Sequence, residues 1–204
     1  MQLVLIRHAL PERATGLVGG ERADPGLTDL GIRQAERLPE AVGPTVDALY
    51  SSPMARALAT AAPLAAALRR DPVVVSDLRE FDAEHNQYLP VHEMARDNPV
   101  AWRRMLDGEF PIPVDTTAFG DRVGAAVEKI IARHPGRTTV VLVAHAGVIN
   151  IWLARLLGLG KPLTFPLDYA GITRVLAGRD GRRIVRSVNE TGHVADLLAL
   201  PTAS

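Results

Sequence analysis

The run TTVVLV at 138–143 is the most β-branched stretch of the chain, and it predicts a buried central strand. It leads directly into the tetrapeptide AHAG at 144–147. A second apolar run, LVLI at 3–6, predicts another buried strand and ends at the pair Arg7-His8. Buried strands of this kind are typical of an α/β fold with a mostly parallel sheet.

Further strand-like runs alternate with longer helix-like stretches outward from these two strands. We expect the other strands at 46–50, 73–75, 172–176 and 182–188, with a hairpin turn around 179–181 joining the last two. We expect helices at 28–42, 52–69, 119–134 and 147–157. The segment from 80 to 119 holds several prolines and no clean periodicity, which favours an inserted helical cap over a second domain.

Capping residues predict where two of these helices begin. Thr28 is a suitable N-cap for the first helix. Ser52 as N-cap, with Pro53 at the first helical position, predicts the start of the second, and we expect Pro63 to kink that helix. The N-terminal N–H groups of the second helix would face the edge where the parallel strands end, which favours a bound anion there.

Length and composition limit the class of protein. The chain has 204 residues, which suits one domain at about 150 residues per domain. Lys and Arg total 23 and Asp and Glu total 23, so no broad basic field is present for nucleic acid or an anionic membrane. The absence of cysteine excludes disulfides, thiolate metal sites and a cysteine nucleophile. No run is long enough for a signal peptide or a membrane span, so we expect a cytoplasmic protein.

Cationic and titratable side chains follow three of the expected strands. Arg7-His8 follows the first strand, Arg56 lies one turn into the helix after the second, and His145 follows the strand at 138–143. Each alone has a structural explanation, such as a solvated helix arginine or a capping histidine. Together they would meet at the sheet edge where ligands bind in open α/β folds. Because the arginine fork suits phosphate oxygens, the sequence predicts a phosphoryl site.

The motifs around these positions resemble those of the histidine phosphatase superfamily, the phosphoglycerate mutase-like proteins. They occur in the right order: RH at 7–8, LTxxGxxQA at 27–35, SSPxxRAxxTA at 51–61, LRE at 78–80 and VAHxG at 143–147. The later stretch NETGH at 189–193 is similar to the closing segment of that family. Five ordered motifs make the resemblance specific.

The resemblance implies a three-layer α/β/α fold, with one domain over 1–204 and a cap insertion at about 81–118. It implies a phosphatase that works through a phosphohistidine. His8 would be the nucleophile, and Arg7, Arg56 and His145 would hold the phosphoryl oxygens. Glu80 would protonate the leaving alkoxide and then deprotonate the attacking water. The arginines would supply the positive charge, so we expect no metal and no cofactor.

The chain departs from the family pattern around the first and fourth motifs. Ala9 and Leu10 replace the usual glycine and acidic residue, and Thr15 is a loose candidate for the usual polar phosphate contact. The segment 81–88 replaces the customary glycine- and tryptophan-containing stretch. It places Asp82 and Glu84 close enough to compete with Glu80 as the acid, although only Glu80 matches the motif.

The remaining histidines and the arginines of the cap favour structural roles. His85 and His92 could suggest a metal site, but they lack the spacing of a zinc-binding helix motif, so a surface position is favoured. His134 suits the end of its helix, and His193 would be structural. The cap residues Arg96, Trp102, Arg103 and Arg104 could meet an acidic or sugar-like substrate, but a solvated helix face is favoured.

Four functions remain open on the sequence alone. The first is a phosphatase for a small phosphorylated substrate, and the second is a mutase that moves phosphate between hydroxyl groups. The third is a non-catalytic protein that binds phosphate or a phosphoprotein, and the fourth is a metal-dependent hydrolase. The intact His8, Arg56, Glu80 and His145 favour the phosphatase. No nucleic acid or membrane partner is expected, and a homodimer remains open.

Overall fold

The β-branched run that predicts a central strand forms β4 (Thr139–Ala144), in the middle of a six-stranded sheet. The computed structural model describes residues 1–14 and 22–198. Across this part of the chain the strand order is β3-β2-β4-β1-β5-β6. β4 pairs in parallel with β1 and β2, while β5 pairs antiparallel with β1 and β6. The other strands are β1 (Gln2–Arg7), β2 (Ala48–Ser51), β3 (Val73–Val74), β5 (Ile172–Ala177) and β6 (Arg183–Glu190).

Alternation along the central strands divides the hydrophobic core in two. Leu3 and Leu5 of β1 belong to one cluster of buried side chains, and Val4 and Ile6 belong to the other. β4 alternates in the same way. Because successive side chains of a strand point to opposite faces, a strand with both faces covered must be apolar throughout. This explains why these strands are continuous hydrophobic runs.

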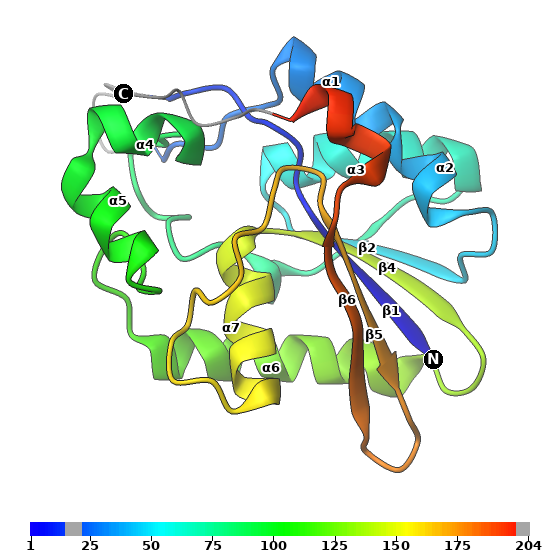
Figure 1. Ribbon diagram of the computed structural model, residues 1–204. Helices are drawn as coiled ribbons and strands as arrows, with labels where there is room; N and C mark the ends of the chain where they lie inside the picture. The colour runs from blue at the N-terminus through cyan, green and yellow to red at the C-terminus, as the bar shows by residue number, and fades with distance from the viewer. Residues whose placement is uncertain (15–21, 199–204) are drawn as a thin grey trace.

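Helices cover both faces of the sheet and complete the expected three-layer α/β/α arrangement. In Figure 1, α1 (Asp29–Glu36), α2 (Leu38–Val42) and α3 (Ala55–Leu68) lie above the sheet. α6 (Thr116–Arg133) and α7 (Ala146–Leu157) lie below it. Two short 3-10 helices, Ser76–Leu78 and Gly192–Leu197, complete these layers. No helix in the described ranges is long and apolar enough to cross a membrane.

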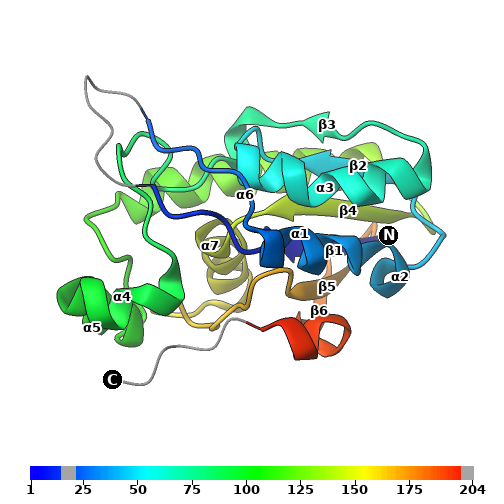
Figure 2. The same cartoon turned by 90° about the horizontal axis from the view of Figure 1, so that it is seen from above.

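Two short helices occupy the segment for which the sequence predicts a cap. α4 (Val91–Asp97) and α5 (Pro99–Leu106) are separated by Asn98, whose side chain accepts a hydrogen bond from the Ala101 N–H at 3.1 Å. Figures 1 and 2 show both helices beside the sheet, beyond the carboxyl end of β1. This places them over the edge where Arg7 and His8 emerge.

Three of the predicted helix boundaries are wrong. The helix expected from residue 119 begins earlier, at Thr116, because the Asp115 side chain caps it. The helix expected over 28–42 is interrupted at Arg37, before Pro39, and becomes α1 and α2. A proline has no N–H to donate and restricts the residue before it, which explains the break. The second helix begins at Ala55 with Met54 as its N-cap, so Pro53 precedes it. Pro63 lies inside that helix, which continues through it to Leu68.

Candidate active site

β1 delivers His8 to the carboxyl edge of the sheet, where its backbone N–H donates to the Ala144 carbonyl at 2.9 Å. The side chain is only 3% exposed. Its Nδ1 lies 2.8 Å from the Ala9 carbonyl oxygen. Because a carbonyl oxygen can only accept a hydrogen bond, Nδ1 carries the ring proton, and the Nε2 lone pair remains available as a nucleophile.

Residues of two other motifs hold the loop that follows His8. The Ala9 N–H donates to Thr60 Oγ1 at 2.9 Å, and the Leu10 N–H donates to Gln34 Oε1 at 2.9 Å. Gly31 leaves no room for a Cβ atom, which would clash with the Leu10 carbonyl oxygen. These contacts give a physical reason for the LTxxGxxQA and SSPxxRAxxTA patterns, since both support the loop that follows His8.

Two buried guanidinium groups flank the pocket. Arg7 is 4% exposed, donates to the Leu167 carbonyl and lies 3.8 Å from the ring centre of Tyr169. Arg56 is fully buried, and one of its terminal nitrogens lies 3.1 Å from Asp82 Oδ1. Buried charges of this kind are costly unless they are paired or serve a ligand.

His145 lies next to His8, with the two ring centres 5.2 Å apart. Its Nε2 is 2.7 Å from Ser52 Oγ, and its Nδ1 is buried with no hydrogen-bond partner among the described residues. Ser52 is therefore not the helix cap that the sequence predicts, because its hydroxyl contacts His145 and also accepts from the Met54 N–H at 3.3 Å. The first N–H of α3, from Ala55, donates to the Asp24 carboxylate at 2.9 Å, so an acid of the chain already occupies that helix end.

Burial sets the protonation of both histidines. Desolvation, followed by the positive charge of Arg56, holds the pKa of His8 well below its usual value of 6.5. The same two causes, in the same order, lower the pKa of His145. Both rings are therefore neutral at physiological pH, as a nucleophilic imidazole must be.

Glu80 presents a carboxyl group to the same cavity. Its Oε2 accepts from the Gly147 N–H at 2.8 Å, and its Oε1 accepts from the Phe81 N–H at 3.1 Å. Burial, and then the negative charge of Asp82, raise the pKa of Glu80 from 4.5 to about 7. A carboxyl group with a pKa near neutrality can both give and take a proton.

The two competing acids occupy different positions. Asp82 also lines the cavity, where it pairs with Arg56. Glu84 is exposed and pairs with Arg22 and Arg79 instead. The geometry therefore keeps Asp82 as a neighbour of the site and places Glu84 outside it.

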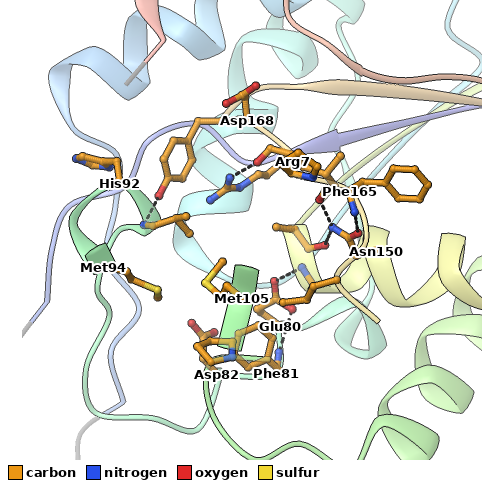
Figure 3. A pocket seen from close by; sticks show the side chains of 18 of the residues that line it. Arg7, Glu80, Phe81, Asp82, His92, Met94, Met105, Asn150, Phe165 and Asp168 are labelled. Carbon is orange, nitrogen blue, oxygen red and sulfur yellow. Dashed lines mark hydrogen bonds between the residues drawn. The ribbon is translucent and has the colours of Figure 1, made fainter. Parts of the chain in front are cut away.

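All five residues singled out from the sequence are brought to one edge of the sheet. One cavity of about 410 Å³ is lined by Arg7, His8, Arg56 and Glu80. The His145 ring lies next to that of His8. Figure 3 shows Arg7 and Glu80 on opposite sides of this cavity, with Met94 and Met105 pointing toward it. A pocket of this size suits a small molecule.

The other polar residues named from the sequence lie in less central positions. His134 contacts the Tyr50 hydroxyl at 2.8 Å, and His193 contacts the Ala170 carbonyl at 3.1 Å. His92 borders the cavity, whereas His85 is exposed. No three His, Asp or Glu side chains gather as metal ligands would within 1–14 and 22–198. Thr15 lies outside the described residues.

Sequence reasoning missed Tyr169. Its ring lies under the Arg7 guanidinium and 5.8 Å from the His8 ring, and its hydroxyl accepts from the Val91 N–H at 3.0 Å. It thereby connects the two motif residues to the start of α4. Tyr169 lies in an irregular segment between α7 and β5 that carries no recognisable pattern, so no sequence motif indicates its position at the site.

A sheet edge that combines a free imidazole nitrogen, two buried arginines and a carboxyl group of raised pKa defines a phosphoryl-transfer class of site. Comparison with known proteins agrees with this class. The model of the histidine phosphatase superfamily (branch 1) matches residues 3–190, and the chain belongs to that family.

Curated relatives and solved structures include several phosphatases. A bifunctional protein of Mycobacterium tuberculosis is 33% identical over 95% of this chain, and the alignment covers 55% of that protein. The chain thus spans about half the length of that relative. Phosphoserine phosphatase 1 of Hydrogenobacter thermophilus is 28% identical, over 96% of this chain and 95% of the relative.

Two solved structures are similar over nearly their whole length. A phosphoserine phosphatase from Entamoeba histolytica, in complex with 3-phosphoglyceric acid, has a TM-score of 0.72 and 26% identity, and the match covers 95% of this chain and 98% of that one. A mycobacterial glucosyl-3-phosphoglycerate phosphatase with inorganic phosphate has a TM-score of 0.73 and 25% identity, covering 95% and 99%.

Proposed function

We propose that this chain is a phosphatase that hydrolyses a small phosphate monoester through a phosphohistidine at His8. In the first step His8 Nε2 attacks phosphorus, the bond from phosphorus to the ester oxygen breaks, and Glu80 gives its proton to the departing alkoxide. In the second step water attacks phosphorus, Glu80 takes a proton from that water, and the bond from phosphorus to nitrogen breaks. Inorganic phosphate leaves, and His8 returns to its neutral form.

The observation that carries this proposal is the state of the His8 ring. The hydrogen bond from Nδ1 to Ala9 fixes the tautomer, and burial beside Arg56 and Arg7 disfavours protonation of Nε2. Because a charged imidazolium has no lone pair to donate, this environment keeps the nucleophile active at neutral pH.

The clamp on the phosphoryl oxygens follows from donors that lack a protein partner. Within the described ranges, Arg7 Nε, Arg56 Nε and His145 Nδ1 are buried without a hydrogen-bond acceptor. Buried donors without partners cost free energy, and phosphoryl oxygens would supply the missing acceptors. We assign Arg7, Arg56 and His145 to this clamp, with His145 donating from its Nδ1.

The same proposal includes metal independence. Two arginines already supply fixed positive charge where negative charge develops in the transition state, so a metal would be redundant. The organisation we propose is one catalytic domain in which residues 81–118 form a cap over the site. A cytoplasmic location and a homodimer stay predictions from the sequence.

The names of the relatives support hydrolysis over the mutase alternative. The proteins similar to this chain include phosphoserine phosphatases and a glucosyl-3-phosphoglycerate phosphatase. We therefore expect wild-type enzyme to release free phosphate without a bisphosphate primer. A strict primer requirement, with no release of phosphate, would establish the mutase instead.

Chelation tests the metal-independent form of the proposal. We expect the rate of p-nitrophenyl phosphate hydrolysis to be the same after dialysis against EDTA as before it, because protein side chains alone hold the phosphoryl group. A rate that collapses on chelation and recovers with zinc or manganese would contradict the proposal and favour the metal-dependent hydrolase.

A further inference from the structure

The outer half of the cavity is lined by apolar side chains of the cap. Val91 and Met94 on α4 are three residues apart and face it together, as do Trp102 and Met105 on α5. α4 has no fully buried residue, so its apolar stripe packs against no core of its own. In a soluble protein, an apolar face left beside a pocket is a surface available to a ligand.

The wall opposite the cap is also apolar. Leu163, Pro166 and Leu167, in the segment between α7 and β5, line the cavity from that side. Phe165 also borders it, with its ring turned away and packed on the core (Figure 3). The Phe165 backbone is held by Asn150, whose side-chain amide donates to the Phe165 carbonyl at 2.9 Å and accepts from its N–H at 2.8 Å. This double contact fixes the wall, so the cavity offers a preformed apolar slot above the phosphoryl position.

Positive charge in the cavity is confined to the phosphoryl position. Among the described residues that line it, Arg7 and Arg56 are the only lysines or arginines. The three arginines of the cap, Arg96, Arg103 and Arg104, do not line the cavity. Arg96 and Arg104 form ion pairs with Asp97 and Glu109 respectively. The sequence of 15–21 and 199–204 contains no lysine or arginine, so these segments bring no cation either.

Negative charge lies on the same walls. Asp82 borders the cavity beside Glu80, where it pairs with Arg56. Asp168 borders it on the Arg7 side, and its carboxylate points away from the cavity and accepts from the Asn189 side-chain amide at 2.8 Å (Figure 3). His92 does not offset them, because burial and the nearby Arg7 lower its pKa and keep it neutral at pH 7. A carboxylate carried by the alcohol part of a substrate would therefore find no lysine or arginine of its own among the described residues that line the cavity.

Resting on the proposed phosphatase function, we propose that the physiological substrate is the phosphate ester of an uncharged, apolar alcohol. The phosphoryl group lies between Arg7 and Arg56, and the alcohol's hydrocarbon part lies against Met94, Trp102 and Met105. This chemistry differs from that of phosphoserine and 3-phosphoglycerate, which both carry a carboxylate. Small alkyl and aryl alcohols share the required property, so the test contains one arm for each.

Matched esters test this specificity. Methyl, butyl, hexyl and benzyl phosphate have similarly basic leaving alcohols, so differences in kcat/KM report contacts with the hydrocarbon part. We expect kcat/KM to rise by roughly two- to fourfold for each added methylene that the slot buries. We expect hexyl or benzyl phosphate to exceed phosphoserine and 3-phosphoglycerate by at least tenfold. A phosphoserine or 3-phosphoglycerate value equal to or above that of hexyl phosphate would overturn the inference.

A substitution in the cap tests whether the apolar slot causes the preference for esters with larger hydrocarbon groups. Trp102→Ala should lower the ratio of kcat/KM for hexyl phosphate to that for methyl phosphate by roughly tenfold, because it removes apolar contact area. Val100→Ala is the matched control, since Val100 is 74% exposed on the same helix and does not line the cavity. An unchanged ratio in Trp102→Ala, or the same fall in Val100→Ala, would contradict the assignment.

The second variant should gain activity toward a carboxylated ester, which misfolding would not produce. Met94→Lys places a cation on the apolar wall. We expect the ratio of kcat/KM for hexyl phosphate to that for 3-phosphoglycerate to fall at least tenfold. An unchanged ratio of these kcat/KM values in Met94→Lys would contradict the assignment of the apolar slot. Failure of the proposed function looks different: no ester would then be hydrolysed, whereas failure of this inference alone leaves phosphate release intact with a carboxylated ester preferred.

Discussion

At the scale of single residues, burial lowers the pKa of His8 and raises the pKa of Glu80. It keeps His8 neutral because a charged imidazole is poorly solvated beside two arginines. It raises the pKa of Glu80 to about 7 because a buried carboxylate is poorly solvated beside Asp82. One physical cause therefore favours, at neutral pH, the protonation states that the proposed nucleophile and the proposed proton donor require.

Glu80→Gln tests the proton donor by way of the leaving group. We expect hydrolysis of alkyl phosphates to fall by roughly 10²- to 10⁴-fold, because an alkoxide cannot leave without a proton. Formation of the phosphoenzyme from p-nitrophenyl phosphate should be largely spared, since p-nitrophenolate is a stable anion. Water attack would then become slow, and rapid-quench measurements should show a burst of p-nitrophenolate.

An equal loss for both substrate types, with no burst, would exclude this role for Glu80. Asp82 would then be the better candidate for the acid, because it is the other carboxyl group beside Glu80 in the same cavity. Glu84→Gln is the matched control: its carboxylate is exposed, and we expect its kinetics to remain those of wild type.

At the scale of elements, the junction of β4 and α7 fixes the position of Glu80. The Gly147 N–H, in the first turn of α7, donates to Glu80 Oε2 at 2.8 Å. A Cβ atom on residue 147 would clash with Glu80 Oε1 and would approach the Phe81 ring to 2.8 Å. The glycine of the VAHxG motif is thus required by the close approach of the acid.

Gly147→Ala should therefore act on catalysis through Glu80. We expect kcat for alkyl phosphates to fall by roughly tenfold or more, with a smaller fall for p-nitrophenyl phosphate, because the acid is displaced. Gly124→Ala in α6 is the matched control, since a Cβ there meets nothing within 4 Å. The control should keep full activity and gain up to about 1 kcal/mol in helix stability. Equal kinetics in the two variants would contradict the account.

The buried strands could be predicted from the sequence, whereas contacts between residues far apart in the chain could not. The strands ending at Arg7 and at Ala144 were predictable because both faces are buried and the runs are uniformly apolar. The contact between Ser52 and His145 was not, because it joins residues 93 positions apart and Ser52 next to Pro53 is an equally good helix start. Tyr169 was missed for a related reason, since only the folded chain brings it under Arg7.

At the scale of the whole molecule, helices cover both faces of the sheet, and the candidate site lies at the carboxyl edge of its parallel strands. Strand alternation produces the two cores, and those cores bury Arg56 and His145 completely. Groups buried for catalysis reduce the stability of the fold, because their charged forms lose hydration. Function and stability therefore oppose each other at Glu80.

The pH dependence of unfolding measures how much stability the raised pKa of Glu80 costs the folded protein. The folded-state pKa of Glu80 lies above its unfolded value, so the folded state binds the proton more tightly and loses stability as pH rises from about 4.5 to 7. Glu80→Gln lacks this loss. We expect the variant's free energy of unfolding, relative to wild type, to grow by up to roughly 3 kcal/mol between pH 4.5 and 8. Urea denaturation at both pH values tests this, and a pH-independent difference would contradict it.

The measurement that tests the central claim most directly is the capture of the phosphoenzyme. Rapid quench with a ³²P-labelled ester should trap label on wild-type protein that is lost in acid and retained in base, as expected for a phosphohistidine. His8→Ala should abolish both label and turnover, whereas His85→Ala, at an exposed position outside the cavity, should keep both. Label that persists on His8→Ala, or wild-type turnover without any labelled intermediate, would contradict the account.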